Sequence, residues 1–220
     1  MIGPRMATML AFLLTDAKVD PADLDAILAR AVERSFNCIS VEGHESTNDT
    51  VLLLASGAAD GPLLKGADLA VLAAEVEAAC IDLAMMIPGD GEGSTHRITI
   101  DVEGALNREE ARTIARAVAD SPLVKTAIHG ADPNWGRIVS AAGYSGVAFD
   151  ESELSLWLNG IPLYQAGVPL PFDDAKVAAN LKANRETSIR LTLTRGSASI
   201  RFWTCDLTAE YVRLNADYTT

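Results

Sequence analysis

Two short apolar runs near the start of the chain constrain its fold more than any other feature. "MLAFLL" at Met9–Leu14 and "VLLLA" at Val51–Ala55 are short, apolar and closed by polar residues, which is typical of buried strands. A longer stretch with apolar residues at helical spacing follows each run. Asp20 and Pro21 begin one as N-cap and first helical residue, and Gly66–Asp68 opens the other. Strands that alternate with helices in this way predict an α/β or α+β fold.

The rest of the chain adds further expected elements. The helix that Gly66 opens is expected to stop before Pro88, and a short strand is expected at Cys38–Val41. After Pro88 the pattern changes to the alternation of "HRITIDVEG", which predicts a strand, and Asn107 then caps a helix. Arg195-Gly196 suits a hairpin turn between the last two strands. The other expected elements are strands at Leu154–Leu158, Ile189–Thr194 and Ile200–Trp203 and a helix at Asp173–Lys182.

The glycine-rich turn Pro88–Gly93 is the expected boundary between two lobes. We place the first lobe at residues 1–94 and the second at residues 95–220. No internal repeat, low-complexity tract or long linker interrupts either lobe, and a chain of 220 residues is long enough to bury a sizeable core.

The charge balance narrows the classes of partner. The chain has a net charge of −12 and no run of Lys and Arg that would form a basic stripe, which argues against nucleic acid and anionic membrane surfaces as partners. The apolar stretch Met6–Leu14 is too short to span a bilayer and lacks the basic start of a signal peptide. We therefore expect a cytoplasmic protein with no membrane partner.

Neither the cysteines nor the histidines have the spacing of a metal site. The three cysteines are widely separated, so we expect buried, unbridged thiols in a reducing compartment. The histidines lack partners at a spacing such as HExxH, so structural or loop roles are expected for them. The sequence has no P-loop, dinucleotide fingerprint or GxSxG elbow, and we expect no metal and no cofactor. The three cysteines are Cys38, Cys80 and Cys205, and the three histidines are His44, His96 and His129.

Two polar clusters are more typical of loops than of active sites. "DPNWGR" at Asp132–Arg137 is expected to fix a turn, with Trp135 packed beneath it and Arg137 paired to a carboxylate. "STNDT" at Ser46–Thr50 is rich in short side chains that bond their own backbone, which shapes a loop. Such loops can also line a pocket.

Thr8 is a hydroxyl inside the apolar opening "MIGPRMATMLAFLLTDA", and residue chemistry leaves two interpretations open. A threonine in a strand is usually structural, because its hydroxyl is a poor nucleophile without a base. Cleavage of the Ala7–Thr8 bond would supply that base as the free α-amine of Thr8, whose pKa is about 8. A threonine activated by its own terminal amine is a known nucleophile.

The opening closely resembles the self-cleavage region of the ornithine acetyltransferase family, the bifunctional glutamate N-acetyltransferases of arginine biosynthesis. That family carries a motif of the form KGxGMxxPxMATML and cleaves itself between the Ala and the Thr. The segments "SFNCISVEGHESTNDTVLLLASG", "DGEGST", "HGADPNWGRI" and "LNADYTT" match further family stretches in the same order. The resemblance therefore covers the whole chain and rests on several independent motifs.

The resemblance implies a fold and an assembly. The implied fold is an α/β (α+β), self-cleaving, N-terminal-nucleophile-like layered sandwich with a smaller C-terminal α/β lobe, so that residues 1–94 would be the nucleophile-bearing lobe. The family's precursor cuts itself into two subunits, and this chain resembles the second (beta) subunit plus seven residues of the first. The first (alpha) subunit supplies an oxyanion-hole Thr-Gly pair and a motif lysine, and one oxyanion donor is worth about 3 kcal/mol of barrier. We therefore expect the chain to be inactive alone and to act in a heterotetramer of two alpha and two beta subunits.

The resemblance also assigns site residues. Thr8 is the nucleophile, Ala7–Thr8 is the processing site, Glu92 contacts substrate, and Asn215 and Thr220 hold its polar groups. The Thr8 hydroxyl would attack the acetyl carbonyl of N-acetylornithine and release ornithine. Glutamate would then accept the acetyl group, which completes a ping-pong cycle. From its charge we expect Glu92 to hold the amine of ornithine. The alternative is that Glu92 only caps its own turn. Asn215 and Thr220 would bond the α-carboxylate that donor and acceptor share.

The chain departs from the family pattern at three places. Arg5 stands where the family often has Asn, next to the scissile bond. "EGHEST" replaces the commoner "DGDTST", which brings His44 and Glu45 to the rim of the expected pocket. His96 replaces a usual Lys and removes one permanent charge. The resemblance implies no cofactor, and acetyl-CoA is a second acetyl donor in some family members.

Three functions remain open at this point. Besides the acetyltransferase, a self-cleaving aminopeptidase or amidase of the same superfamily would use water as the acceptor. A non-catalytic module would never expose Thr8 as its first residue. The ending "NADYTT" favours the transferase, because a peptidase does not need a carboxylate-binding tail of that form. N-terminal sequencing separates the third function, since an enzyme would start at Thr8 and an inert module at Met1 or Ile2.

Overall fold

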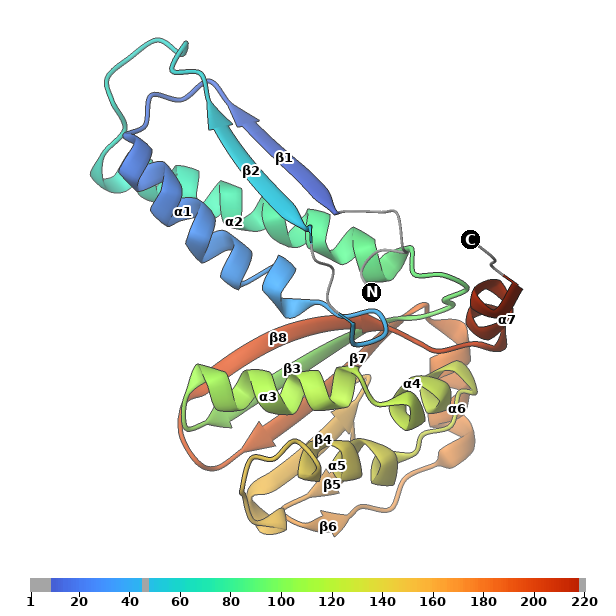
Figure 1. Ribbon diagram of the computed structural model, residues 1–220. Helices are drawn as coiled ribbons and strands as arrows, with labels where there is room; N and C mark the ends of the chain where they lie inside the picture. The colour runs from blue at the N-terminus through green and yellow to red at the C-terminus, as the bar shows by residue number, and fades with distance from the viewer. Residues whose placement is uncertain (1–8, 45–47, 218–220) are drawn as a thin grey trace. The chain divides into compact units, whose positions relative to one another are not determined.

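The computed structural model describes residues 9–44 and 48–217, which Figure 1 shows as a ribbon. These residues form two compact units, with the division between Ile87 and Pro88. Each unit combines strands with helices, so the expected mixed α/β class is confirmed. None of the helices in these ranges is both long and apolar enough to cross a membrane.

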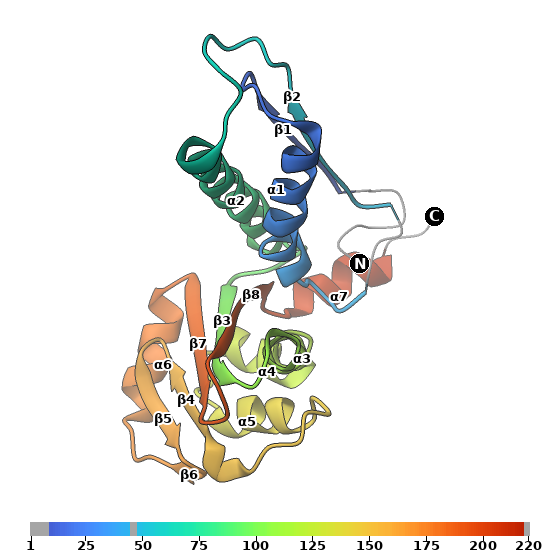
Figure 2. The ribbon, with the colours of Figure 1, turned by 90° about the vertical axis from the view of Figure 1, so that its left-hand side faces the viewer.

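The first unit is a parallel pair of strands with two helices on one face. Its elements are β1 (Leu10–Thr15), α1 (Pro21–Glu33), β2 (Thr50–Ala55) and α2 (Gly66–Gly89). Leu10 of β1 lies opposite Thr50 of β2, and α1 provides the crossover that a parallel pair requires. Figures 1 and 2 show α1 and α2 side by side along the same face of the two strands. Asp20 caps α1 as expected, because its carboxylate accepts the Ala22 N–H at 2.9 Å.

The strands β1 and β2 are buried on one face only, so the expectation of fully buried strands was wrong. Ala11, Leu13 and Leu53 point toward the helices and are buried. Successive side chains of a strand point to opposite faces, and α1 and α2 cover only one of them. The other face carries large exposed side chains, which we call the open β1–β2 face: Leu10, Phe12, Leu14, Leu52 and Leu54.

Two other expectations in this unit also need correction. The segment expected as a strand at Cys38–Val41 begins instead with a 3-10 turn at Phe36–Cys38. That turn forms because the Ser35 hydroxyl donates to the Ala31 carbonyl at 2.6 Å and the Cys38 N–H donates to Ser35 O at 2.8 Å. α2 does not stop before Pro88 but includes it and ends one residue later at Gly89, and the missing N–H of the proline removes one hydrogen bond of the last turn.

The second unit is a mixed six-stranded sheet with the strand order β6-β5-β4-β7-β3-β8. Its strands are β3 (Arg97–Ala105), β4 (Leu154–Leu158), β5 (Ile161–Gln165), β6 (Val168–Pro169), β7 (Glu186–Leu193) and β8 (Ala198–Cys205). Its helices are α3 (Arg108–Ala119), α4 (Pro122–His129), α5 (Trp135–Gly143), α6 (Asp174–Ala183) and α7 (Ala209–Asp217). Figure 2 shows α3, α4 and α5 together along one side of the sheet, away from α6.

The core of this unit lies between the sheet and α3. Alternate residues of β3 and β7 are almost fully buried, as the strand period requires. The apolar face of α3 packs on β3 and β8, and its expected cap is confirmed, because the Asn107 side chain accepts the Glu110 N–H at 2.9 Å. The side chains concerned are Ile98, Ile100, Val102, Ala111, Ile114, Ala115, Val118, Ile189 and Leu191.

The last two long strands do not form the expected hairpin. β3 lies between them, parallel to β7 and antiparallel to β8, so Arg195-Gly196 arches over the end of β3. The Arg195 and Gly196 N–H groups both donate to the Gly104 carbonyl, at 3.1 and 2.8 Å. Gly104 has φ +75°, and a Cβ there would lie 1.9 Å from the Leu193 carbonyl oxygen. Sequence order alone placed β7 beside β8, because the insertion of an earlier strand leaves no local signal.

Candidate functional site

The structure brings together two of the predicted site residues. The Asn215 amide donates to a carboxylate oxygen of Glu92 at 2.8 Å, although 123 positions separate them in the sequence. Ala7, Thr8 and Thr220 lie outside the described residues, as do Arg5 and Glu45. The site that can be described is therefore the surface around Glu92 and Asn215, all of it within the second unit.

Glu92 lies on a tight turn that follows α2. The Ser94 N–H donates to the Gly91 carbonyl at 3.0 Å, so backbone atoms close the turn. The Glu92 carboxylate instead accepts the hydrogen bond from Asn215. Gly93 has φ +66°, and a Cβ there would lie 2.8 Å from the Tyr211 nitrogen. The turn therefore needs glycine both for its backbone conformation and for the close approach of α7.

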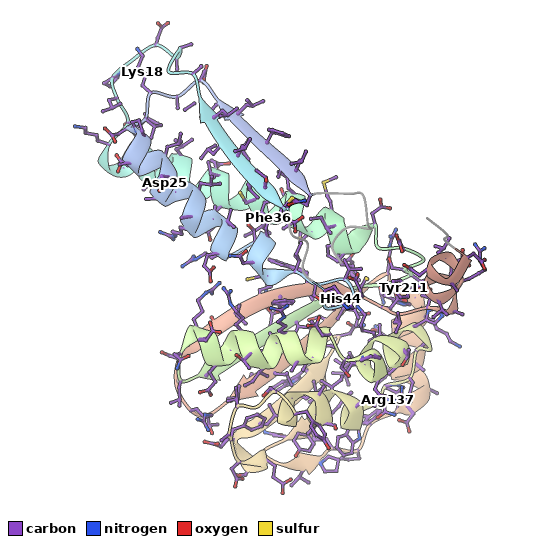
Figure 3. All side chains as sticks on the ribbon, viewed as in Figure 1. Lys18, Asp25, Phe36, His44, Arg137 and Tyr211 are labelled. Atoms are coloured by element: carbon purple, nitrogen blue, oxygen red, sulfur yellow. The ribbon has the colours of Figure 1, made fainter. Side chains whose placement is uncertain are left out.

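Asn215 lies on α7, a helix that the sequence analysis missed. Thr208 precedes the helix, and its hydroxyl accepts the Tyr211 N–H at 3.1 Å, which is the geometry of an N-cap. The signal was available, since a threonine cap is followed here by Glu210 in the first turn. Figure 3 labels Tyr211 on that first turn. Burial raises the pKa of the Tyr211 phenol, and the nearby Glu92 carboxylate raises it further.

Asp206 lies directly behind this turn and is buried. One carboxylate oxygen accepts the backbone N–H groups of Thr95 and His96, at 2.8 and 2.9 Å. The other accepts the Thr95 hydroxyl at 2.5 Å and lies 3.1 Å from Nδ1 of His129. Burial alone would raise the pKa of Asp206, but the hydrogen bonds from Thr95 and His96 outweigh it and hold the pKa below the ordinary value. Asp206 is therefore an ionised carboxylate that anchors the segment after Glu92.

Two of the three histidines contact this anchor. His96 is 9% exposed, with Nδ1 3.3 Å from Asp206 and Nε2 3.2 Å from the Leu181 carbonyl oxygen. His129 shares the same carboxylate oxygen. Within residues 9–44 and 48–217, no group of three or more His, Cys, Asp and Glu side chains is placed to hold a metal ion.

A buried lysine that the sequence analysis did not single out lies nearby. Lys125 is 3% exposed, and its ammonium donates to the Thr204 hydroxyl at 2.9 Å. Burial lowers its pKa, which the charges of Cys205, Asp120 and Asp206 partly oppose. Burial also raises the pKa of the Cys205 thiol. All three cysteines are buried and unbridged, as predicted.

The described residues of the two polar clusters make structural contacts, and one expectation needs correction. Asn134 caps α5, and Trp135 stacks on Tyr164 with 5.4 Å between ring centroids, so the expected packing of Trp135 is confirmed. Arg137, labelled in Figure 3, donates to the Leu123 carbonyl at 3.0 Å and not to a carboxylate, because α5 packs against α4 and places this guanidinium beside the first turn of α4. In "STNDT", the Asp49 carboxylate accepts the Met9 N–H at 3.0 Å.

The fold of this chain matches that of a solved structure. A solved structure, the crystal structure of the arginine biosynthesis bifunctional protein ArgJ from Bacillus halodurans, superimposes with a TM-score of 0.92 at 40% sequence identity. The match covers 96% of this chain and 100% of that chain, and it gives this chain a mixed α/β fold of the N-terminal-nucleophile type.

The particular family follows from the sequence comparison. The profile of the ArgJ family matches residues 1–220, and the chain belongs to that family. The resemblance inferred from the motifs is thereby confirmed. The arginine biosynthesis bifunctional protein ArgJ of Chlorobium chlorochromatii is 48% identical over 218 residues, which are 99% of this chain and 51% of that protein. Its namesake from Parasynechococcus marenigrum is 47% identical over 220 residues, 100% of this chain and 53% of that protein. The chain thus spans about half the length of these curated relatives.

Proposed function

We propose that this chain is the second-subunit portion of an acetyltransferase of arginine biosynthesis. It would take the acetyl group of N-acetylornithine onto Thr8 and pass it to glutamate. Membership of the ArgJ family supports this assignment, and its relatives are named as bifunctional proteins of arginine biosynthesis. The observation that carries the proposal is the contact between Glu92 and Asn215, two distant positions to which the motif resemblance gives substrate contacts.

The hydrogen bonds of Asn215 indicate how a substrate would enter. Its amide nitrogen donates to Glu92 at 2.8 Å and to the Tyr211 carbonyl at 2.9 Å, so both N–H groups are in use. A substrate carboxylate can take one of them only if one of these bonds opens, and we propose that it is the bond to Glu92. The ammonium of ornithine then compensates Glu92 for the lost donor. A ligand that has both a cation and a carboxylate therefore replaces the internal bond at the lowest cost.

The chemical step falls to Thr8. Its hydroxyl oxygen would bond to the acetyl carbon while its α-amine takes the hydroxyl proton. The α-ammonium would then give that proton to the amide nitrogen of N-acetylornithine as the bond between this nitrogen and the acetyl carbon breaks, so that the nitrogen leaves as the amine of ornithine. The amine of glutamate would then attack the acetyl-threonine ester and restore the hydroxyl. No cofactor is needed for either step. Acetyl-CoA could supply the same ester by thioester exchange, and we propose it as a second donor.

The first (alpha) subunit is the proposed partner of this chain. A two-stranded parallel sheet with large apolar side chains on one face is not a typical finished surface. Leu14 is 78% exposed and Phe12 is 55% exposed on the open β1–β2 face. We propose that the first subunit covers this face and supplies the oxyanion-hole groups. Two copies of each subunit would form a heterotetramer in the cytoplasm, a compartment that suits the unbridged cysteines.

The test is an intact-mass measurement on the chain co-produced with the first subunit. After incubation with N-acetylornithine, we expect a chain that begins at Thr8 and carries one additional acetyl group. Addition of glutamate should remove that group and yield N-acetylglutamate. Acetyl-CoA in place of N-acetylornithine tests the second donor. A Thr8→Ala variant is the control, and it should remain uncut and unmodified.

Each other result identifies a different function. Loss of the acetyl group in buffer alone, at the same rate as with glutamate, would make water the acceptor and the protein an amidase. A chain that is neither cut nor acetylated would remove the enzymatic assignment altogether. Thr8 would then be an ordinary threonine.

A further inference from the structure

The segment between β8 and α7 contains two side chains that both reach back to the turn of Glu92. Asp206 and Thr208 are two residues apart, and both are buried. Asp206 holds the part of the turn after Glu92 through the N–H groups of Thr95 and His96. Thr208 holds the part next to Glu92, because its hydroxyl donates to the Gly93 carbonyl at 2.9 Å.

The Thr208 hydroxyl joins two elements at once. It donates to the carbonyl of Gly93 on the turn and accepts the N–H of Tyr211 on α7. A hydroxyl has one donor and two acceptor sites, so the single O–H of Thr208 is fully used by the bond to Gly93. The close approach of Tyr211 to Gly93 leaves no room for a Cβ at Gly93, so the turn and the helix are also in direct contact.

α7 depends on these bonds to an unusual degree. None of its nine residues is buried, and Val212 and Leu214 are 58% and 39% exposed. Isolated helices shorter than about 12 residues are marginal in water, and packing of an apolar face normally supplies the missing stability. α7 lacks such a buried face within the described structure. Its position is therefore set by the hydrogen bonds at Thr208 and at Asn215.

We propose that Thr208 is a positioning residue that fixes the distance between Glu92 and Asn215. The Glu92–Asn215 bond is exposed and must open when substrate enters, so it cannot itself maintain the spacing of the two groups. The buried Thr208 hydroxyl makes its bonds to backbone atoms that no substrate displaces. It therefore keeps the two substrate-binding side chains in register in the free and the bound protein. This inference rests on the proposed function for its consequence in catalysis, but not for the fastening of α7.

The experiment compares three variants of the chain co-produced with the first subunit. Thr208→Val removes the hydroxyl at nearly constant volume, and Thr208→Ser retains it. Thr187→Val is the matched control, because Thr187 is 2% exposed and its hydroxyl has no hydrogen-bond partner among the described residues. Hydrogen exchange of the α7 amides is measured for each variant, together with KM and kcat for transfer from N-acetylornithine to glutamate.

We expect Thr208→Val, which removes both hydrogen bonds of the hydroxyl, to raise both KM values about tenfold while kcat stays nearly unchanged. Exchange at α7 should become faster in the same variant. Thr208→Ser should restore both properties, and Thr187→Val should match the wild type. If the hydrogen exchange of the α7 amides were unchanged in Thr208→Val, the proposal that Thr208 holds α7 in place would be overturned. Unchanged KM values with faster exchange would overturn the positioning role.

Failure of the proposed function gives a different result. A wild-type assembly that transfers no acetyl group removes the acetyltransferase assignment and with it the catalytic consequence of Thr208. The exchange rates of α7 then decide alone whether Thr208 fastens the helix. A general loss of structure in Thr208→Val would lower kcat and speed exchange throughout the second unit, and it would contradict a local role.

Discussion

The exposed side chains of the open β1–β2 face allow us to predict how much free energy they contribute to association with the first subunit. We consider the double substitution Leu14→Ser and Phe12→Ser. Both side chains are on the outer face of β1, at 78% and 55% exposure, and neither supports the fold of this chain by burial. Full burial of one such side chain contributes about 1.5–3 kcal/mol. Scaled by the exposed fractions, the pair should contribute about 3 kcal/mol to association with the first subunit.

The assay is dissociation of the co-produced subunits in urea, followed by size-exclusion chromatography and extrapolated to water. An energy of about 3 kcal/mol corresponds to roughly a hundredfold weaker association. Leu106→Ser is the control, because Leu106 is 56% exposed at the end of β3 in the second unit. The reasoning would be refuted if the double variant dissociated at the wild-type urea concentration. It would also be refuted if Leu106→Ser weakened association as much as the double variant.

Three further predictions concern the Met9 contact, the buried carboxylate and the arch. Asp49→Ala should slow cleavage of the Ala7–Thr8 bond, because it removes the acceptor of the Met9 N–H, and a time course on a gel measures this. Asp206 has a lowered pKa in the fold, so its stabilisation is present above 3.8 and is lost as the pH falls through the folded value. Urea midpoints should therefore show Asp206→Asn less stable at neutral pH, with the difference shrinking in acid; a difference constant in pH would contradict this. Gly104→Ala should destabilise by about 3 kcal/mol or more, since its Cβ would collide with the Leu193 carbonyl, whereas Gly143→Ala, with open space around it, should not reduce the melting temperature.

Local signals in the sequence predicted the elements that local chemistry determines. The caps at Asp20 and Asn107 fixed the starts of α1 and α3, and the alternation after Pro88 predicted β3. The helix at Asp173–Lys182 was also predicted, and α6 is capped by Asp173. In each case a side chain or a period within a few residues decides the structure.

The incorrect predictions concern features of the fold that segments far apart in the sequence determine. The burial of β1 depends on what covers each of its faces, and a run such as "MLAFLL" does not record this. The place of β3 between β7 and β8 depends on pairing with residues about 90 positions later, as in the bond between Arg97 and Glu186. The short elements β5 and β6 were missed because runs of five and two residues give little periodicity.

The candidate site shows the same distinction between residues that a local motif identifies and residues that only the folded structure brings together. Glu92 and Asn215 were assigned from motifs, and nothing in the spacing of 123 residues indicated that they touch. Asp206 and Thr208 were not assigned, since a lone acid and a lone threonine after a strand have many possible roles. Only the structure shows that both reach the same turn.

The strand order of the second unit has a consequence for synthesis of the chain. β3 is made before its two neighbours, and both of its edges stay unpaired until β7 and then β8 have left the ribosome. Pairing of β3 therefore waits for the last quarter of the polypeptide, and contacts between such distant segments form slowly. During that interval β3 is a strand with one apolar face and two free edges, which is the kind of segment that aggregates or recruits chaperones. Overproduction of this protein should accordingly benefit from slow translation at low temperature.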